Sequence, residues 1–233
     1  PKLIYVMPNF QNPTGYTYSE RKRKYLLLLC KKYDVTVVED DYMSDLSYLD
    51  VGKRPLKALD REGRVIYIKS FSKIFMPGLR VGYLIIPEGL KENVMGIKHI
   101  TDIYTSGLMQ RVLDLYFRSG IWSKHLEYMK REYSLRYFEA VRSARKYLRG
   151  ASFTQPYGGL NLWVKLPEKV SSVELFERCR DRKVIFTPGT VFIKGEAGEM
   201  HIRISFAAAS LGKIAEGISI IGNVMEEIKD SAK

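Results

Sequence analysis

The segment SFSKIFMPGLR, from Ser70 to Arg80, brings two hydroxyl groups, an amine and a guanidinium group into one short stretch of chain. It follows directly on the apolar run 65–68, which is typical of a buried strand. A lysine at the end of a buried strand is costly unless its charge is used. Hydroxyl groups and cations in one place suit an anion, so we expect Ser70, Ser72, Lys73 and Arg80 to form an anion site.

Polar residues also follow the other strands that the sequence predicts. In an open α/β sheet, ligands bind beyond the carboxyl ends of the strands. If the strands are neighbours, an amide, a carboxylate, a phenol and an amine converge in one cleft. The residues concerned are Asn12 after strand 3–7, Asp40, Asp41 and Tyr42 after strand 35–38, and Lys73 after strand 64–69.

Apolar runs in the first part of the chain predict four short strands, with at least one helix, 19–33, among them. The strands are expected at 3–7, 35–38, 64–69 and 80–86. This is the pattern of a mostly parallel α/β sheet. Helices follow over 88–149, and the remainder mixes strands and helices. We predict part of a large α/β domain over 1–125 and a smaller α+β domain with a long connecting helix over 126–233.

Composition limits the classes of function. The 233 residues include 45% hydrophobic and 27% charged ones, which allows a sizeable core, and no apolar stretch approaches a membrane span. The cysteines Cys30 and Cys179 form no disulfide framework, so a cytoplasmic location is expected. The three histidines lack the spacing of metal ligands, so we expect no metal. The net charge of +12 is dispersed over helix-like segments without a nucleic-acid-binding motif.

One cofactor requires the set of groups at the strand ends. Pyridoxal phosphate (PLP) needs a lysine for a Schiff base, a carboxylate beside its pyridine nitrogen, donors to its ring oxygen, and hydroxyl groups with a cation for its phosphate. The carboxylate keeps the ring nitrogen protonated, so that the ring accepts electron density. The order of Ser70 and Lys73 also fits the S-x-x-K motif of penicillin-binding proteins, but the chain contains no K-T-G and no S-D-N.

Four motifs in order, NPTG, EDDY, SFSK with GLRVGY, and IRISFA, resemble the class I and II aminotransferases of PLP fold type I. The resemblance covers the chain from residue 1 to near 230. It implies an amino-group transfer between an amino acid and a 2-oxo acid by a homodimer. The resemblance implies that Lys73 forms the Schiff base and that Asp40 pairs with the pyridine nitrogen. It also implies that Asn12 and Tyr42 donate to the ring oxygen, and that Ser70, Ser72 and Arg80 bind the phosphate. Arg203, together with Asn12, is expected to bind the carboxylate of the substrate.

The spacing of Asp40 and Tyr42, two residues apart in EDDYMSDLSY, is most similar to the aminotransferase-like domain of MocR-type regulators of the GntR family. Aminoadipate and kynurenine aminotransferases are similar too. In a MocR-type regulator the domain binds PLP and an effector amine, and DNA is bound only through a winged-helix domain, which we do not expect within these 233 residues. The spacing leaves open whether Asp40 or Asp41 faces the ring nitrogen.

The resemblance begins part-way through the family's fold. It implies that the chain corresponds to the second half of the large domain and the whole small domain. The family's N-terminal part, which carries a phosphate-binding loop and an aromatic residue that stacks on the ring, is expected to be missing. An incomplete fragment without activity is therefore a further alternative.

Overall fold

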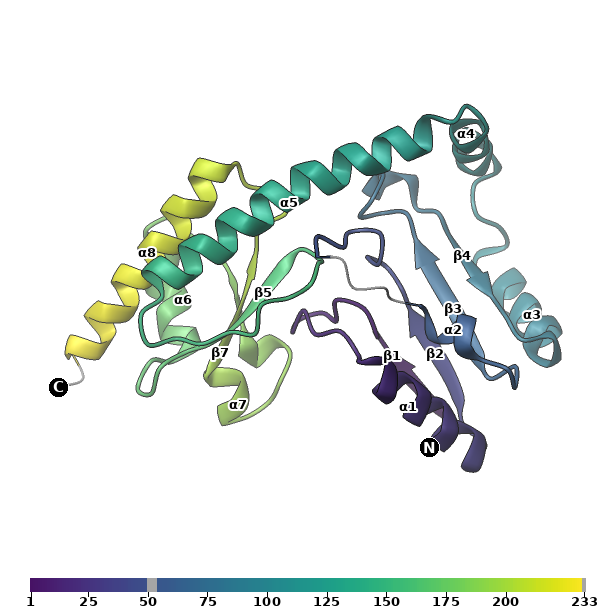
Figure 1. Cartoon of the computed structure of the whole chain (residues 1–233), viewed down its shortest axis with the longest axis horizontal. Helices are drawn as coiled ribbons and strands as arrows, with labels where there is room; N and C mark the ends of the chain where they lie inside the picture. The colour runs from purple at the N-terminus through teal and green to yellow at the C-terminus, as the bar shows by residue number, and fades with distance from the viewer. Residues whose placement is uncertain (50–53, 232–233) are drawn as a thin grey trace. The chain divides into compact units, whose positions relative to one another are not determined.

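The computed structural model describes residues 1–49 and 54–231, which form two compact units (Figure 1). Unit 1 consists of Pro1–Phe10 and Thr17–Lys130, and unit 2 consists of Gln11–Tyr16 and Arg131–Lys233. The division falls inside the long helix α5 (Ile121–Tyr147). Assigning 1–125 and 126–233 to the large and small domains of a PLP enzyme stays a prediction.

Unit 1 is built on a four-stranded sheet in the order β1-β2-β3-β4. The strands are β1 (Leu3–Val6), β2 (Thr36–Asp40), β3 (Val65–Ser70) and β4 (Gly82–Ile85). The first three are parallel, and β4 pairs with β3 in the antiparallel direction. This confirms the predicted α/β fold with a mostly parallel sheet.

Helices connect these strands and follow the last of them. They are α1 (Glu20–Lys32), α2 (Leu56–Leu59), α3 (Lys91–Asp102), α4 (Gly107–Arg118) and the 3-10 helices Pro77–Leu79 and Glu88–Leu90. The helix predicted over 19–33 is present as α1, and its N-cap is Ser19, whose hydroxyl accepts a hydrogen bond from the Lys22 amide at 3.2 Å. Cys30 of α1 and Leu56 of α2 pack on Val37 and Val65 in the core.

Alternation along the strands gives the sheet two different faces. The face that α1 and α2 cover, here called the covered face, carries Ile4, Val6, Val37, Glu39, Val65, Tyr67 and Lys69. The opposite face, here called the open face, carries Leu3, Tyr5, Thr36, Val38, Asp40, Ile66, Ile68 and Ser70, all of them half-buried or exposed. The two faces therefore offer different surroundings to polar groups at the strand ends.

Arg23 of α1 holds the chain in place where it leaves β1. This buried guanidinium donates to the Pro8 carbonyl at 3.0 Å, to Asn9 Oδ1 at 2.6 Å and to the Arg54 carbonyl at 3.1 Å. Its burial lowers the pKa of Arg23, but these acceptors satisfy the donors. The path of the chain into the NPTG motif is thus fixed from inside unit 1.

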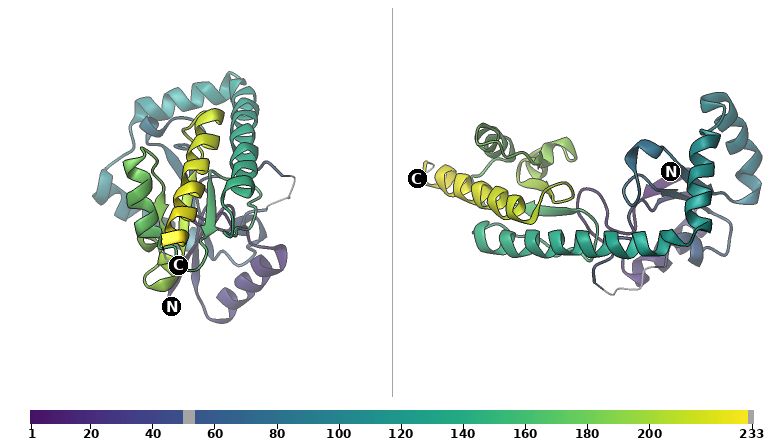
Figure 2. Two further views of the ribbon diagram at one scale, coloured as in Figure 1. Left: turned by 90° about the vertical axis from the view of Figure 1, so that its left-hand side faces the viewer. Right: turned by 90° about the horizontal axis from the view of Figure 1, so that it is seen from above.

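Unit 2 is an α+β structure around a three-stranded antiparallel sheet in the order β5-β7-β6. The strands are β5 (Asn161–Lys165), β6 (Thr187–Pro188) and β7 (His201–Ser205). The helices are α6 (Ser172–Asp181), α7 (Glu196–Glu199), α8 (Leu211–Ser231) and the 3-10 helix Gly189–Val191. α8 runs beside the end of α5 (Figure 2), where a Cβ at Gly222 would meet the Tyr147 carbonyl oxygen at 2.3 Å.

Among the described residues, no helix has the length and apolar character needed to cross a membrane. Within the same residues, no group of three or more His, Cys, Asp or Glu side chains is placed to hold a metal ion.

Candidate active site

Lys73 lies in a turn that its neighbours hold rigidly. The Phe75 amide donates to the Phe71 carbonyl at 2.9 Å, and a ring nitrogen of His125 lies 2.8 Å from the Ile74 carbonyl oxygen. Phe71 and Phe75 both pack edge-on against the Trp122 ring. Lys73 itself is exposed, and within residues 1–49 and 54–231 its amine has no hydrogen bond or ion pair. Its amine can therefore react with a ligand.

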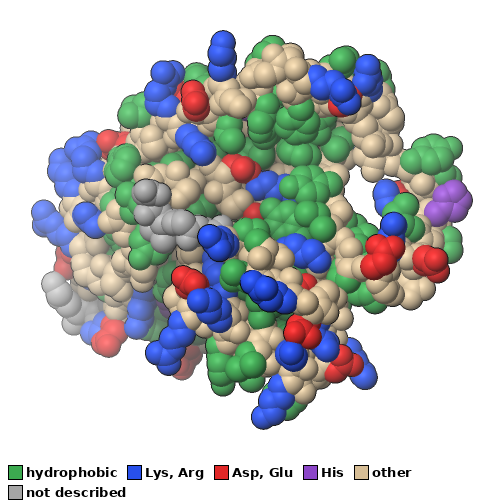
Figure 3. All heavy atoms as spheres, turned by 45° about the vertical axis from the view of Figure 1, so that its right-hand side comes forward, with side chains coloured by type: hydrophobic (Ala, Val, Ile, Leu, Met, Phe, Trp, Pro, Cys, Tyr) green, Lys and Arg blue, Asp and Glu red, His purple; other side chains and the backbone are tan. Residues whose placement is uncertain are grey.

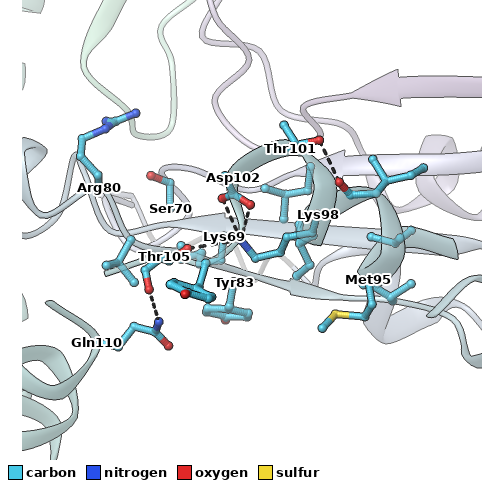
Figure 4. A pocket seen from close by; sticks show the side chains of 18 of the residues that line it. Lys69, Ser70, Arg80, Tyr83, Met95, Lys98, Thr101, Asp102, Thr105 and Gln110 are labelled. Carbon is cyan, nitrogen blue, oxygen red and sulfur yellow. Dashed lines mark hydrogen bonds and ion pairs between the residues drawn. The ribbon is translucent and has the colours of Figure 1, made fainter. Parts of the chain in front are cut away.

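The three residues predicted to bind phosphate lie together around this turn. The Ser72 amide donates to Ser70 Oγ at 3.3 Å, and Arg80 Nη1 lies 3.5 Å from Ser72 Oγ. All three line a cavity of about 830 Å³ in unit 1 (Figure 4). Lys98, on the same cavity wall, is already paired with Asp102 at 2.8 Å. Among the cations that line this cavity, Arg80 is therefore the one in contact with a serine hydroxyl of the segment 70–72.

Gly82 allows β4 to approach this segment closely. It pairs with Ser70 across the β3-β4 ladder. A Cβ at Gly82 would lie 2.5 Å from the Lys69 carbonyl oxygen, closer than real Cβ atoms come. The glycine of the GLRVGY motif therefore has a packing reason beside the cavity.

Asp40 and Asp41 point to opposite sides of the sheet. Asp40 ends β2 on the open face, where its Oδ2 accepts a hydrogen bond from the Tyr5 hydroxyl. Asp41 is buried, and its Oδ2 accepts from the Tyr67 hydroxyl at 2.6 Å. Only Asp40 is therefore accessible from the open face.

Asp41 belongs to a buried polar cluster that also contains Lys69, Ser44, Asp45 and Tyr67. Lys69 Nζ lies 2.5 Å from Asp45 Oδ2 and 3.8 Å from Asp41 Oδ2, and it donates to Ser44 Oγ at 3.0 Å. Burial, and then the hydrogen bond to Asp41, raise the pKa of Tyr67 well above its ordinary value. On the covered face, the amine of Lys69 is thus paired with two carboxylates, whereas the amine of Lys73 has no such partner among the described residues.

Tyr42 and Asn12 occupy different units. The Tyr42 hydroxyl is half-buried in unit 1 and lies 3.4 Å from the Phe10 carbonyl oxygen. Asn12 belongs to the segment Gln11–Tyr16, which is part of unit 2. Gly15 in that segment has φ +68°, and a Cβ there would meet Pro156 Cβ at 3.0 Å. The positive φ and the close approach of Pro156 both require a glycine at this position of NPTG.

In unit 2, Arg203 is held at both ends of its guanidinium group. Nη1 donates to Asn12 Oδ1 at 2.8 Å, and Nη2 donates to Thr187 Oγ1 at 3.0 Å. The guanidinium carbon also lies 4.9 Å from the centre of the Phe192 ring. These contacts fix the orientation of the planar guanidinium group, whose shape suits a bidentate contact with a carboxylate.

The structure thus groups the predicted residues into sets. Ser70, Ser72 and Arg80 meet beside Lys73, while Asn12 meets Arg203 in unit 2. Sequence reasoning missed Tyr5 and Thr187, the partners of Asp40 and Arg203. A hydroxyl group within the apolar run LIYV was a possible signal for Tyr5, and the position of Thr187 directly before Pro188-Gly189 was a possible signal for Thr187.

Apolar side chains are exposed on the part of unit 1 that carries β4 and α3 (Figure 3). They include Leu84, Ile85, Met95, Ile97 and Ile100, the last 85% exposed. Tyr83 and Met95 line the same cavity as Ser70 and Arg80. The cavity is therefore lined by hydrophobic side chains as well as polar ones.

Comparisons with known proteins identify the family of the chain. The family model for aminotransferase class I and II matches residues 2–221. Aromatic-amino-acid aminotransferase 1 of Thermococcus litoralis is 32% identical, over 97% of this chain and 54% of its own length. The uncharacterized HTH-type transcriptional regulator YisV of Bacillus subtilis is 36% identical, over 93% of this chain and 45% of its own. The chain spans about half the length of these relatives.

A solved structure extends the likeness to the fold. The kynurenine aminotransferase of Pyrococcus horikoshii, in complex with PMP, superposes with a TM-score of 0.92 at 35% identity. The match covers 97% of this chain and 56% of that one. The fold and the family resemblance expected from the four motifs are confirmed, and PMP is the amine form of the cofactor expected from the sequence.

Proposed function

The chain belongs to the aminotransferase class I and II family, and from this premise we propose that it binds PLP at Lys73 and transfers an amino group between an amino acid and a 2-oxo acid. The observation that carries the proposal is the contrast between its two neighbouring lysines. Lys73 is exposed and unpaired among the described residues, whereas two carboxylates neutralise Lys69.

The donor set in unit 1 fits the cofactor. Ser70, Ser72 and Arg80 offer two hydroxyl groups and a guanidinium group for a phosphate. Asp40 offers a carboxylate on the open face, and Asp41, which is buried in the polar cluster, does not. This geometry favours Asp40 as the partner of the pyridine nitrogen, the question that the sequence left open.

Each residue then has a definite task. When bound, the cofactor supplies an electron sink for a carbanion next to the amino nitrogen. Lys73 Nζ would hold the cofactor covalently and move protons to and from the substrate. Asp40 would keep a proton on the ring nitrogen, and the Tyr42 hydroxyl would donate to the ring oxygen.

Unit 2 would recognise the substrate. The guanidinium fork of Arg203, oriented by Asn12 and Thr187, suits the carboxylate that amino acids and 2-oxo acids share. Asn12 would also donate to the ring oxygen of the cofactor, as the family resemblance implies. A homodimer and a cytoplasmic location remain predictions.

The second candidate is a sensor, which the similarity to the regulator YisV favours. The same residues would bind PLP and an effector amine, and DNA would be bound through a winged-helix domain of the regulator. Sensing needs Lys73 and Asp40 just as catalysis does, so the two candidates differ in turnover and not in binding. A third candidate, a fragment without activity, would fail to bind the cofactor at all.

The test is a single-turnover experiment. The chain is mixed with PLP and an L-amino acid, beginning with the aromatic ones because one relative is an aromatic-amino-acid aminotransferase, and 2-oxo acid is measured by mass spectrometry. We expect up to one 2-oxo acid per Lys73, and none from the Lys73→Ala variant. PLP binding without 2-oxo acid would favour the sensor, and no PLP binding would contradict both.

A further inference from the structure

Tyr5 is the one described residue that donates a hydrogen bond to the Asp40 carboxylate. Its hydroxyl donates to Oδ2, and among residues 1–49 and 54–231 no other hydrogen bond to Asp40 is present. Neither residue of the pair is buried, because Tyr5 is 52% exposed and Asp40 is half-buried. The Asp40 carboxylate thus has one oxygen engaged and the other available.

The parallel pairing of β1 and β2 dictates this contact. Tyr5 lies opposite Val38 in the ladder, and Asp40 follows Val38 by two residues on the same face. A tyrosine side chain is long enough to reach a diagonal neighbour across two strands. Packing gives no reason for a hydroxyl group here, because Leu3 occupies the same face two residues earlier without one.

The hydroxyl group of Tyr5 remains a donor throughout the physiological range. Partial burial, and then the hydrogen bond to Asp40, raise the pKa of Tyr5 well above its ordinary value. A phenol hydroxyl that donates to a carboxylate oxygen forms a directional hydrogen bond, which restrains the carboxylate in one orientation.

We propose that Tyr5 is a positioning residue, which engages Asp40 Oδ2 and so turns Oδ1 toward the pyridine nitrogen of the cofactor. The inference rests on the proposed function, because it assigns to Asp40 the role given there. The proposed cofactor site then includes Tyr5 of β1 in addition to Asp40 of β2. Tyr5 contacts the Asp40 carboxylate and does not contact the cofactor. Residues that orient a ligand in this way commonly affect affinity although they make no contact with the bound group.

A double-mutant cycle tests the proposal with PMP as the probe, because PMP binds without bonding to Lys73. The affinity for PMP is measured by calorimetry for the wild type, Tyr5→Phe, Asp40→Asn and the double variant. We expect Tyr5→Phe to weaken PMP binding roughly tenfold, and to have no further effect in the Asp40→Asn background. Tyr25→Phe, an exposed tyrosine of α1, is the matched control and should bind like the wild type.

Each outcome decides between the claims. PMP binding by the wild type with equal affinity in Tyr5→Phe would overturn the inference and leave the proposed function intact. A Tyr5→Phe effect that persists in the Asp40→Asn background would also overturn it, because Tyr5 would then act through another group. No PMP binding by the wild type would contradict the proposed function, and the inference with it. Near-ultraviolet circular dichroism of each variant separates these effects from misfolding.

Discussion

Asp40 and Asp41 are adjacent in the sequence, yet the sheet places them in opposite surroundings. Asp40 lies on the open face with one tyrosine donor, while Asp41 is buried on the other side with Tyr67, Ser44 and Lys69. The lysines repeat the contrast, since Lys69 is neutralised by carboxylates and Lys73 is exposed. Residue type therefore does not identify the accessible groups: the face of the sheet separates the two aspartates, and the turn after β3 exposes Lys73.

This comparison predicts opposite costs for the two lysines. Lys69→Met leaves the Asp41 and Asp45 carboxylates buried without their cation, so we expect the free energy of unfolding to fall by about 3 to 5 kcal/mol. Lys73→Met removes an exposed amine and should change it by less than about 0.5 kcal/mol. Urea unfolding of unit 1 can be followed by Trp122 fluorescence in a Trp163→Phe background. An equal loss of unfolding free energy in Lys69→Met and Lys73→Met would contradict the contrast between the two lysines.

Substitutions of the two aspartates should also change the free energy of unfolding by different amounts, but the difference should be smaller than for the lysines. Asp41→Asn weakens the charge pairing with Lys69 and a hydrogen bond to Tyr67, so we expect a loss of about 2 kcal/mol in the free energy of unfolding. Asp40→Asn should cost at most about 1 kcal/mol, because Asp40 is half-buried and bonds only Tyr5 among the described residues. Its larger effect should appear in cofactor affinity. A greater loss of stability for Asp40→Asn would contradict the account.

The smallest effect concerns pH and Glu39, which is buried on the covered face. Burial raises the pKa of Glu39, although it accepts hydrogen bonds from the Leu56 and Lys57 amides at 2.8 Å. A raised pKa in the folded state means that Glu39 adds stability at low pH, which is lost as pH rises through that pKa. Acidification from pH 7 toward pH 4 should therefore stabilise the wild type relative to Glu39→Gln. A difference that shrinks or reverses on acidification would contradict this sign.

Much of the fold could be read from the sequence because its signals are local. The apolar, β-branched runs indicated the strands, and the pattern over 19–33 indicated a helix that the structure contains as α1. The side of the sheet on which each aspartate lies could not be read. The strand predicted at 35–38 continues through Asp40 in β2, and this extension fixes the alternation of the two acids.

The partners of the site residues depended on long-range packing. Arg203 lies in β7 between Ile202 and Ile204, which are both buried, so alternation along the strand agrees with its position. Its acceptors Asn12 and Thr187 come from distant parts of the sequence, so no periodicity could pair them with it. The same holds for Tyr5 and Asp40, which meet only through the register of two parallel strands.

The most direct test of the central claim is to locate the amine that reacts with PLP. The chain is mixed with PLP, the carbon–nitrogen bond is reduced with borohydride, and the labelled peptide is mapped by mass spectrometry. We predict label on Lys73 and none on Lys69, because only the first has an exposed amine without a partner among the described residues. Label on Lys69, or label scattered over surface lysines, would contradict the account.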